Sequence, residues 1–157
     1  MAVVKVLKNP EVITHAYLVS APVGAGRPNR RDDVLLIQFF LAALAPLNDP
    51  ATQESFQPPG APPLAIDGFW GHNSQRYLDH YLAVFNRGSA KVSDKGVWSD
   101  SAVDPVLPGQ FVGTIHGRTM VMISLNAAFR AILGTPAHAQ LHTNPLFPRE
   151  LADQFYF

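Results

Sequence analysis

The hydrophobic positions of this chain recur at helical spacing in three stretches. The stripe of the first stretch comprises Val34, Ile37, Leu41 and Leu44. These positions follow one another at the spacing of one face of an α-helix. Further leucine and phenylalanine residues widen the apolar surface around most of this helix, which is typical of a helix that is central in a fold or has a second partner. Asp32 or Asp33 suits its start, and Pro46 is expected to end it.

A second helix is predicted further along the chain. Asn73 or Ser74 can cap its start, and Arg87 and Gly88 are expected to close it. Its apolar face comprises Tyr77, Leu78, Tyr81, Leu82 and Phe85. This stripe is expected to belong to the core, with polar residues lying off that face.

The third helix is predicted over residues 117–133, and Gly134 stops it. Its apolar residues again recur with helical spacing. Asn126 and Arg130 lie off the apolar face, so both are expected to face water.

Near the N-terminus, β-branched and aromatic residues dominate two short runs, 3–7 and 12–19. A turn signal at residues 8–11 separates them. The pattern predicts two short extended segments or a loose hairpin.

The predicted fold class is mainly α, organised as one domain over residues 1–157. An extended segment (1–22) precedes a helical core (23–134), and a docking tail (135–157) follows it. Two long loops, 47–63 and 88–116, interrupt the core. Loop 47–63 is rich in proline, so we expect it to be either a stiff contact arm or a tolerated surface insertion.

Composition narrows the classes of partner. Twelve basic and twelve acidic residues give no net charge, so electrostatics provides no reason to expect nucleic acid or an anionic membrane. Only 15% of the residues are charged, and the zero net charge favours association near neutral pH. No run reaches the roughly 18 apolar residues of a membrane span. No secretory signal peptide is recognised, so we expect synthesis in the cytoplasm, with delivery to the periplasm or cell wall by a non-classical route.

The stretch 63–74 is expected to organise the chain. Within it, Asp67 and Gly68 form a tight turn, and Gly71 allows the turn to enter the second helix. Asp67 is expected to accept backbone N–H bonds across the turn. Gln38 is the one polar residue in the middle of the first helix, and its buried amide would be satisfied by the backbone of a neighbouring loop.

No motif indicates catalysis. The chain has no cysteine, which excludes thiol hydrolases and disulfides. Its three glutamates lie in predicted loops or chain ends, unlike the paired acids of a glycosidase. His138 and His142 lie four residues apart without a third ligand, which is weak evidence for zinc. A noncatalytic protein without cofactor or metal is therefore the favoured expectation.

Two segments together resemble the three-helix type of peptidoglycan-binding domain. That family has a helix of the form Asp-Val-x-x-Val/Leu-Gln-x-x-Leu, and residues 33–41 read DVLLIQFFL. Its second motif is Asp-Gly-x-x-Gly-x-x-Thr, and residues 67–74 read DGFWGHNS. Ser74 replaces the threonine, His72 replaces the usual proline, and the loop between the motifs is longer than usual. The resemblance covers about residues 20–86 and, more loosely, the third helix.

The resemblance implies a noncatalytic module that binds cell-wall glycan. The ring of Trp70 is the candidate platform for a sugar, unless Phe69 and Trp70 fill the interior of the bundle. Asn73, Gln75 and Arg76 would supply hydrogen bonds beside it, since a sugar site combines an apolar platform with a few placed polar groups. Asp67, Gly68, Gly71, Ser74 and Gln38 would be structural.

Two alternatives remain open at this point. The scaffold can instead serve as a protein-interaction or structural component of a bacterial secretion system or phage-like assembly. Its partner, or a second copy of the chain, would contact the aromatic C-terminus at Leu151, Phe155, Tyr156 and Phe157, unless these residues pack on the body of the domain. The other alternative is a small cell-wall hydrolase with an unfamiliar site.

Overall fold

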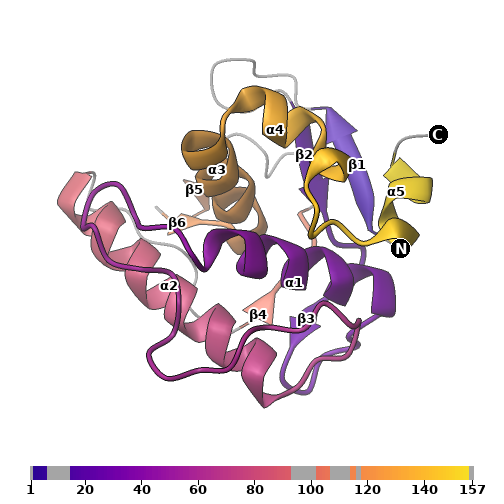
Figure 1. The fold of residues 1–157 in the computed structure, drawn as a ribbon, viewed down its shortest axis with the longest axis horizontal. Coiled ribbons are helices and arrows are strands. Elements are labelled where there is room, and N and C mark those ends of the chain that lie inside the picture. The colour runs from indigo at the N-terminus through magenta and orange to yellow at the C-terminus, as the bar shows by residue number, and fades with distance from the viewer. Residues whose placement is uncertain (1, 7–14, 93–101, 107–113, 116–117, 156–157) are drawn as a thin grey trace.

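The protein is mainly helical, as the sequence predicts (Figure 1). The computed structural model describes residues 2–6, 15–92, 102–106, 114–115 and 118–155. The helices in these residues are α1 (Arg31–Leu44), α2 (His72–Val92), α3 (Val121–Leu133), α4 (Thr135–Ala139), the 3₁₀ helix η1 (Leu141–Thr143) and α5 (Arg149–Phe155). No helix among the described residues is long and apolar enough to cross a lipid bilayer.

Short strands accompany the helices in antiparallel pairs. Strand β1 (Val3–Val6) pairs with β2 (His15–Leu18), with Val3 opposite Leu18, so the predicted N-terminal hairpin is confirmed for these residues. The residues that join the two strands lie outside the described part of the chain. The remaining pairs are β3 (Val23–Gly24) with β4 (Ala102–Val103), and β5 (Thr114–Ile115) with β6 (Arg118–Thr119).

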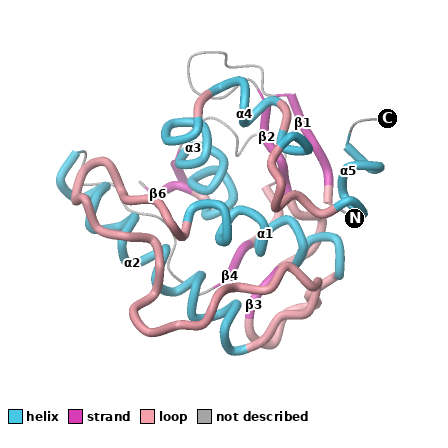
Figure 2. The backbone as a smooth tube through the Cα atoms, in the orientation of Figure 1, coloured by secondary structure: helices cyan, strands magenta, loops and turns pink. Residues whose placement is uncertain are grey.

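Helix α1 is the centre of the fold. Every residue from Asp33 to Leu41 is buried, including the stripe that the sequence predicts. The helix contacts α2, α3, α5 and β3. The backbone trace shows it crossing the middle of the molecule, with α2 on one side and α3 on the other (Figure 2). The apolar surface around α1 is therefore explained by partners on several sides within this chain.

Both predicted ends of the second helix are wrong. Helix α2 begins at His72, so Asn73 and Ser74 lie in its first turn rather than ahead of it. The helix also continues through Gly88 to Val92, so the predicted loop 88–116 begins too early. Gly88 is buried and lies against the Asp49 carboxylate, where only a residue without a side chain fits. The glycine therefore serves a close approach within the helix rather than ending it.

The third helix begins four residues later than predicted, because Arg118–Thr119 belongs to β6. The expectation that Asn126 faces water is also wrong, since its side chain is fully buried. Its Oδ1 accepts a hydrogen bond from the Tyr17 N–H (2.9 Å), and its Nδ2 donates to the Tyr17 carbonyl (2.9 Å). His138 Nε2 lies 2.9 Å from the same Oδ1. Asn126 thus joins β2 and α4 to α3 through satisfied polar contacts.

The C-terminal residues pack on the body of the domain. Leu151 is fully buried in the core. Phe155 is partly buried, and its ring centroid lies 5.6 Å from that of Tyr17. Leu151 therefore presents no surface for a partner. Tyr156 and Phe157, the other residues of the predicted contact, lie outside the described residues.

We predict that Gly88→Ala destabilises the protein, although alanine is the better helix former. A Cβ atom at position 88 would lie 2.5 Å from Oδ2 and 2.9 Å from Oδ1 of Asp49. Asp49 cannot move away freely, because its Oδ2 accepts hydrogen bonds from the backbone N–H groups of Ala51 and Thr52 and from the Thr52 hydroxyl. Urea denaturation should show a loss of about 1–3 kcal/mol in the free energy of unfolding.

The matched test repeats this substitution in an Asp49→Ala background. There the obstruction is absent, so Gly88→Ala should be neutral or stabilising by up to about 1 kcal/mol. An equal cost in both backgrounds would contradict the steric explanation.

A second prediction concerns alkaline pH. The buried Tyr81 hydroxyl lies 3.1 Å from Ser124 Oγ, and it donates there because the Ser124 hydroxyl donates to the Val121 carbonyl. Burial raises the pKa of Tyr81 far above its ordinary value. The neutral phenol therefore makes its full contribution to stability below about pH 10, the pKa of tyrosine in the unfolded chain. This contribution is lost as the pH rises further. Urea denaturation measures the free energy of unfolding at about pH 8 and at about pH 11. Its decrease between these two pH values should be smaller for Tyr81→Phe than for the wild type. Equal losses would contradict this.

Candidate functional site

The turn at residues 67–70 is fixed to α1 by the side chain of Gln38. Gln38 Oε1 accepts hydrogen bonds from the N–H groups of Asp67 (3.1 Å) and Gly68 (2.9 Å). Its Nε2 lies within hydrogen-bonding distance of the Phe69 carbonyl (2.9 Å), Asp67 Oδ1 (3.1 Å) and Ser74 Oγ (3.1 Å). The prediction that a loop backbone satisfies this buried amide is confirmed. The Ser74 hydroxyl takes part in this contact.

Arg31 holds the same turn from one end of α1. Its Nη1 donates to the Asp67 carbonyl (2.7 Å), and its Nε and Nη2 donate to the Glu150 carboxylate of α5 (3.1 and 2.8 Å). This hydrogen-bonded pairing raises the pKa of Arg31 and lowers the pKa of Glu150. Gly68 has a φ of +80°, and a Cβ there would lie 2.7 Å from Arg31 Nη1. Glycine therefore permits both the turn and the approach of the guanidinium group.

The backbone of the turn is satisfied by side chains. The Phe69 N–H donates to Asp67 Oδ1 (3.0 Å), as the predicted role of Asp67 requires. With the contacts of Arg31 and Gln38, the N–H and carbonyl groups of both Asp67 and Phe69 are bonded. The main chain of the turn at these two residues is therefore held by hydrogen bonds to side chains.

The two aromatic residues of the turn have different environments. Phe69 is 73% exposed, and the Arg31 guanidinium lies 5.6 Å from its ring centroid. Trp70 is half-buried against the core, and its Nε1 donates to Gln75 Oε1 (2.8 Å). The expectation that Phe69 fills the interior is wrong, whereas Trp70 does pack against it. Phe69 directly follows Gly68, and its N–H and carbonyl groups bond to Asp67 and Gln38 while its ring is left outside.

A small hollow borders Phe69. We call it the Phe69 hollow, and its volume is about 240 Å³. It is lined by Gln38, Pro63, Leu64, Ala65, Asp67, Phe69, Trp70, Gly71, Asn73 and Ser74. Two predicted ligand-binding residues, Trp70 and Asn73, therefore meet here. Asn73 Nδ2 donates to the Pro62 and Pro63 carbonyls (3.2 and 3.4 Å), which leaves its Oδ1 as an acceptor at the hollow.

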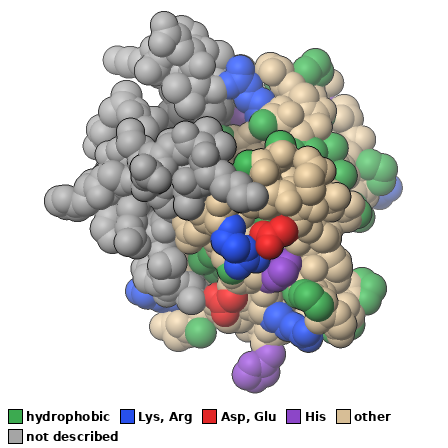
Figure 3. Space-filling view, turned by 90° about the vertical axis from the view of Figure 1, so that its left-hand side faces the viewer, with side chains coloured by type: hydrophobic (Ala, Val, Ile, Leu, Met, Phe, Trp, Pro, Cys, Tyr) green, Lys and Arg blue, Asp and Glu red, His purple; other side chains and the backbone are tan. Residues whose placement is uncertain are grey.

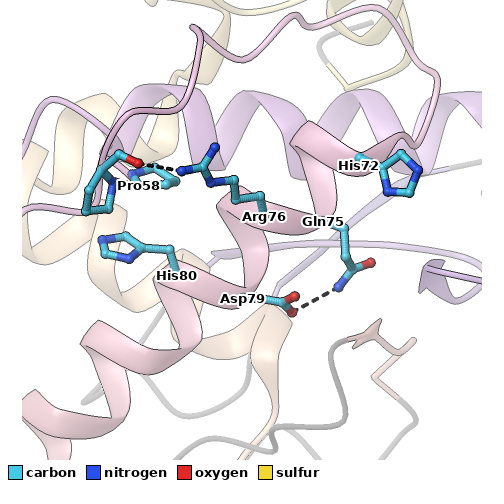
Figure 4. Close-up of a pocket in the computed structure, with 7 residues that line it drawn as sticks. Pro58, His72, Gln75, Arg76, Asp79 and His80 are labelled. Carbon is cyan, nitrogen blue, oxygen red and sulfur yellow. Dashed lines mark hydrogen bonds between the residues drawn. The ribbon is translucent and has the colours of Figure 1, made fainter.

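The other two predicted ligand-binding residues, Gln75 and Arg76, line a larger depression. We call it the α2 groove, and its volume is about 540 Å³. It is lined by Pro58, Pro59, His72, Gln75, Arg76, Asp79 and His80 (Figure 4). The structure thus divides the predicted site between two hollows, both bordered by the first turn of α2. The α2 side of the molecule bears basic, acidic and histidine side chains close together (Figure 3).

A segment of the proline-rich loop runs along α2 between these two hollows. Prolines have no N–H group, so the helix contacts their carbonyl groups with side-chain donors. The Tyr77 hydroxyl donates to the Pro62 carbonyl (2.8 Å) and accepts from Gln57 Nε2 (2.8 Å). The Arg87–Glu54 ion pair (2.8 Å) adds a contact further along α2. The predicted surface loop 47–63 is therefore attached to the domain and forms walls of both hollows.

No group of three or more histidine, aspartate or glutamate side chains is placed to hold a metal ion within the described ranges. Comparison of the chain with protein-family models, with curated proteins and with solved structures found no match.

We predict that Gln38→Glu strongly destabilises the fold. The substitution keeps the shape and one acceptor, but it replaces Nε2 by an oxygen that faces the Phe69 carbonyl and Asp67 Oδ1. Urea denaturation at neutral pH should show a loss of about 2–4 kcal/mol in the free energy of unfolding. Gln154→Glu, the same change at an exposed position of α5, should cost less than about 0.5 kcal/mol. Equal effects at the two positions would contradict the role of the Gln38 amide.

Proposed function

We propose that this chain is a noncatalytic module that binds peptidoglycan, with Phe69 as its aromatic platform. The observation that carries the proposal is a hydrogen-bonded turn that holds a phenylalanine 73% exposed at the edge of a hollow. A single exposed apolar side chain is common on protein surfaces, so the features that favour a ligand here are the hydrogen-bonded backbone of Phe69 and the hollow beside its ring. An aromatic ring beside a few placed polar groups is a suitable surface for a sugar.

The arrangement of the two sequence motifs supports the proposal. Gln38 of the first motif bonds to the backbone of Asp67, Gly68 and Phe69 in the second. The segments that resemble the peptidoglycan-binding family are therefore joined directly in space. A three-helix bundle of that type, built from α1, α2 and α3, is the finer fold assignment that goes with this proposal.

The chemistry required of the site is recognition only. The Phe69 ring would lie against the apolar face of a sugar ring, and Asn73 Oδ1 would accept a hydrogen bond from a hydroxyl or acetamido N–H group. Because Gln38 and Asp67 already fix the backbone of Phe69, binding would not have to order the turn. Phe69 replaces Trp70 as the expected platform, since the Trp70 ring packs against the core.

Sedimentation with purified, insoluble peptidoglycan tests the proposal. The wild-type protein should be retained at low salt, and Phe69→Ala should weaken retention by about tenfold, a loss of about 1.4 kcal/mol. Because the Phe69 ring is exposed, this variant should keep the wild-type stability.

Leu146→Ala is the matched control. It removes another exposed apolar side chain, 47% exposed and outside both hollows, and retention should not change. Absence of retention for the wild type would refute the proposal, and equal retention of the wild type and Phe69→Ala would refute the role of the platform.

A further inference from the structure

We infer that the α2 groove binds a carboxylate of the ligand, while a sugar ring lies against Phe69. This inference rests on the proposed function, because it assigns the acidic part of the same ligand to the second hollow. The two hollows have no lining residue in common, but neighbouring residues in the first turn of α2 line them, His72 the groove and Asn73 the Phe69 hollow. One ligand with a sugar and an acidic substituent would therefore contact consecutive residues of the helix.

Arg76 is the permanent cation of the groove. It is exposed, and one of its nitrogens, Nη2, donates to the Pro59 carbonyl. No acidic side chain in the described ranges forms an ion pair with it, whereas Arg31 and Arg87 each pair with a glutamate. The proline carbonyl orients the guanidinium plane without neutralising its charge. The remaining N–H groups match a carboxylate, which a guanidinium group binds with two parallel hydrogen bonds.

His80 lines the groove on the side that Arg76 faces. In Figure 4 both side chains extend toward Pro58. His80 Nε2 lies 2.9 Å from the Ser55 carbonyl oxygen, which can only accept, so Nε2 carries the hydrogen. This contact fixes the ring and leaves Nδ1 as an acceptor, which suits a hydroxyl or N–H group of the ligand, so the carboxylate is left to Arg76. The prolines opposite offer carbonyl groups and apolar rings but no competing charge.

The one acid of the groove, Asp79, is turned away from this cationic side. Its Oδ1 accepts a hydrogen bond from Gln75 Nε2 (3.0 Å), and Figure 4 shows the pair on the other side of the helix from Arg76. Gln75 Oε1 in turn accepts from the Ala25 N–H (3.0 Å) and from Trp70 Nε1 (2.8 Å). This chain of hydrogen bonds orients the Asp79 carboxylate toward Gln75, on the side of the groove away from Arg76. The groove thus presents positive charge on its proline side, although the whole chain has no net charge.

Calorimetric titration of the full chain with two soluble probes tests the inference. Muramyl dipeptide carries a free carboxylate, and chitotriose is a neutral sugar of related chemistry. The wild type should bind muramyl dipeptide about tenfold more tightly than chitotriose. Arg76→Gln should abolish this preference by lowering the affinity for muramyl dipeptide about tenfold. Arg149→Gln, the same loss of charge at an exposed position outside both hollows, should keep the preference.

The outcomes separate the inference from the function on which it rests. Equal affinity of the wild type for both probes would overturn the carboxylate site and leave sugar binding intact. A preference of Arg76→Gln for muramyl dipeptide over chitotriose would also overturn the carboxylate site. Retention of the wild type on insoluble peptidoglycan without any binding of muramyl dipeptide would overturn it as well. Failure of both probes together with no retention on insoluble peptidoglycan would refute the proposed function and the inference with it.

Discussion

The contact between the Gln38 amide and the turn at residues 67–69 is the constraint on which the rest of the structure depends. Gln38 lies in the central helix and is only 1% exposed. A buried amide without hydrogen-bond partners would lower the stability of the fold. The turn supplies the N–H groups of Asp67 and Gly68 as donors and the Phe69 carbonyl as acceptor. These hydrogen bonds to Gln38 hold the Phe69 backbone in place. The start of α2 follows directly, and residues of its first turn line both hollows.

The residues of the core were the most predictable part of the fold. The stripes of α1 and α2 are periodic, and burial of a periodic face requires no knowledge of the partner. Helix ends were harder, because they depended on distant contacts. Gly88 is a stop signal in isolation, but the Asp49 carboxylate from another segment occupies the space of its missing side chain. Asn126 appeared to be a surface residue because the backbone of Tyr17, which binds it, is far away in sequence.

The candidate site was predictable in its location but not in its arrangement. The glycines around Phe69 and Trp70 marked the turn, and the need of Gln38 for a backbone partner was apparent from its position in an apolar helix. Whether Phe69 or Trp70 is exposed depends on how the hydrogen bonds orient the backbone of the turn. The hydrophobic periodicity of the sequence does not encode that orientation. The division of the predicted ligand residues between two hollows depended on the path of the proline-rich segment, whose carbonyl groups are held by side chains of α2.

The way in which Gln38 and Asn126 hold their partners has an evolutionary consequence. Gln38 binds the Phe69 carbonyl and Asn126 binds the N–H and carbonyl groups of Tyr17, so these hydrogen bonds do not depend on the side chains at positions 69 and 17. At Phe69 the backbone is thereby fixed while the side chain remains open to selection. Under the proposed function, substitutions at this position would change what the turn recognises without loss of the contacts that support it. Backbone support and the exposed ring are separated at a single residue, and in that proposal one scaffold would thereby acquire different ligands.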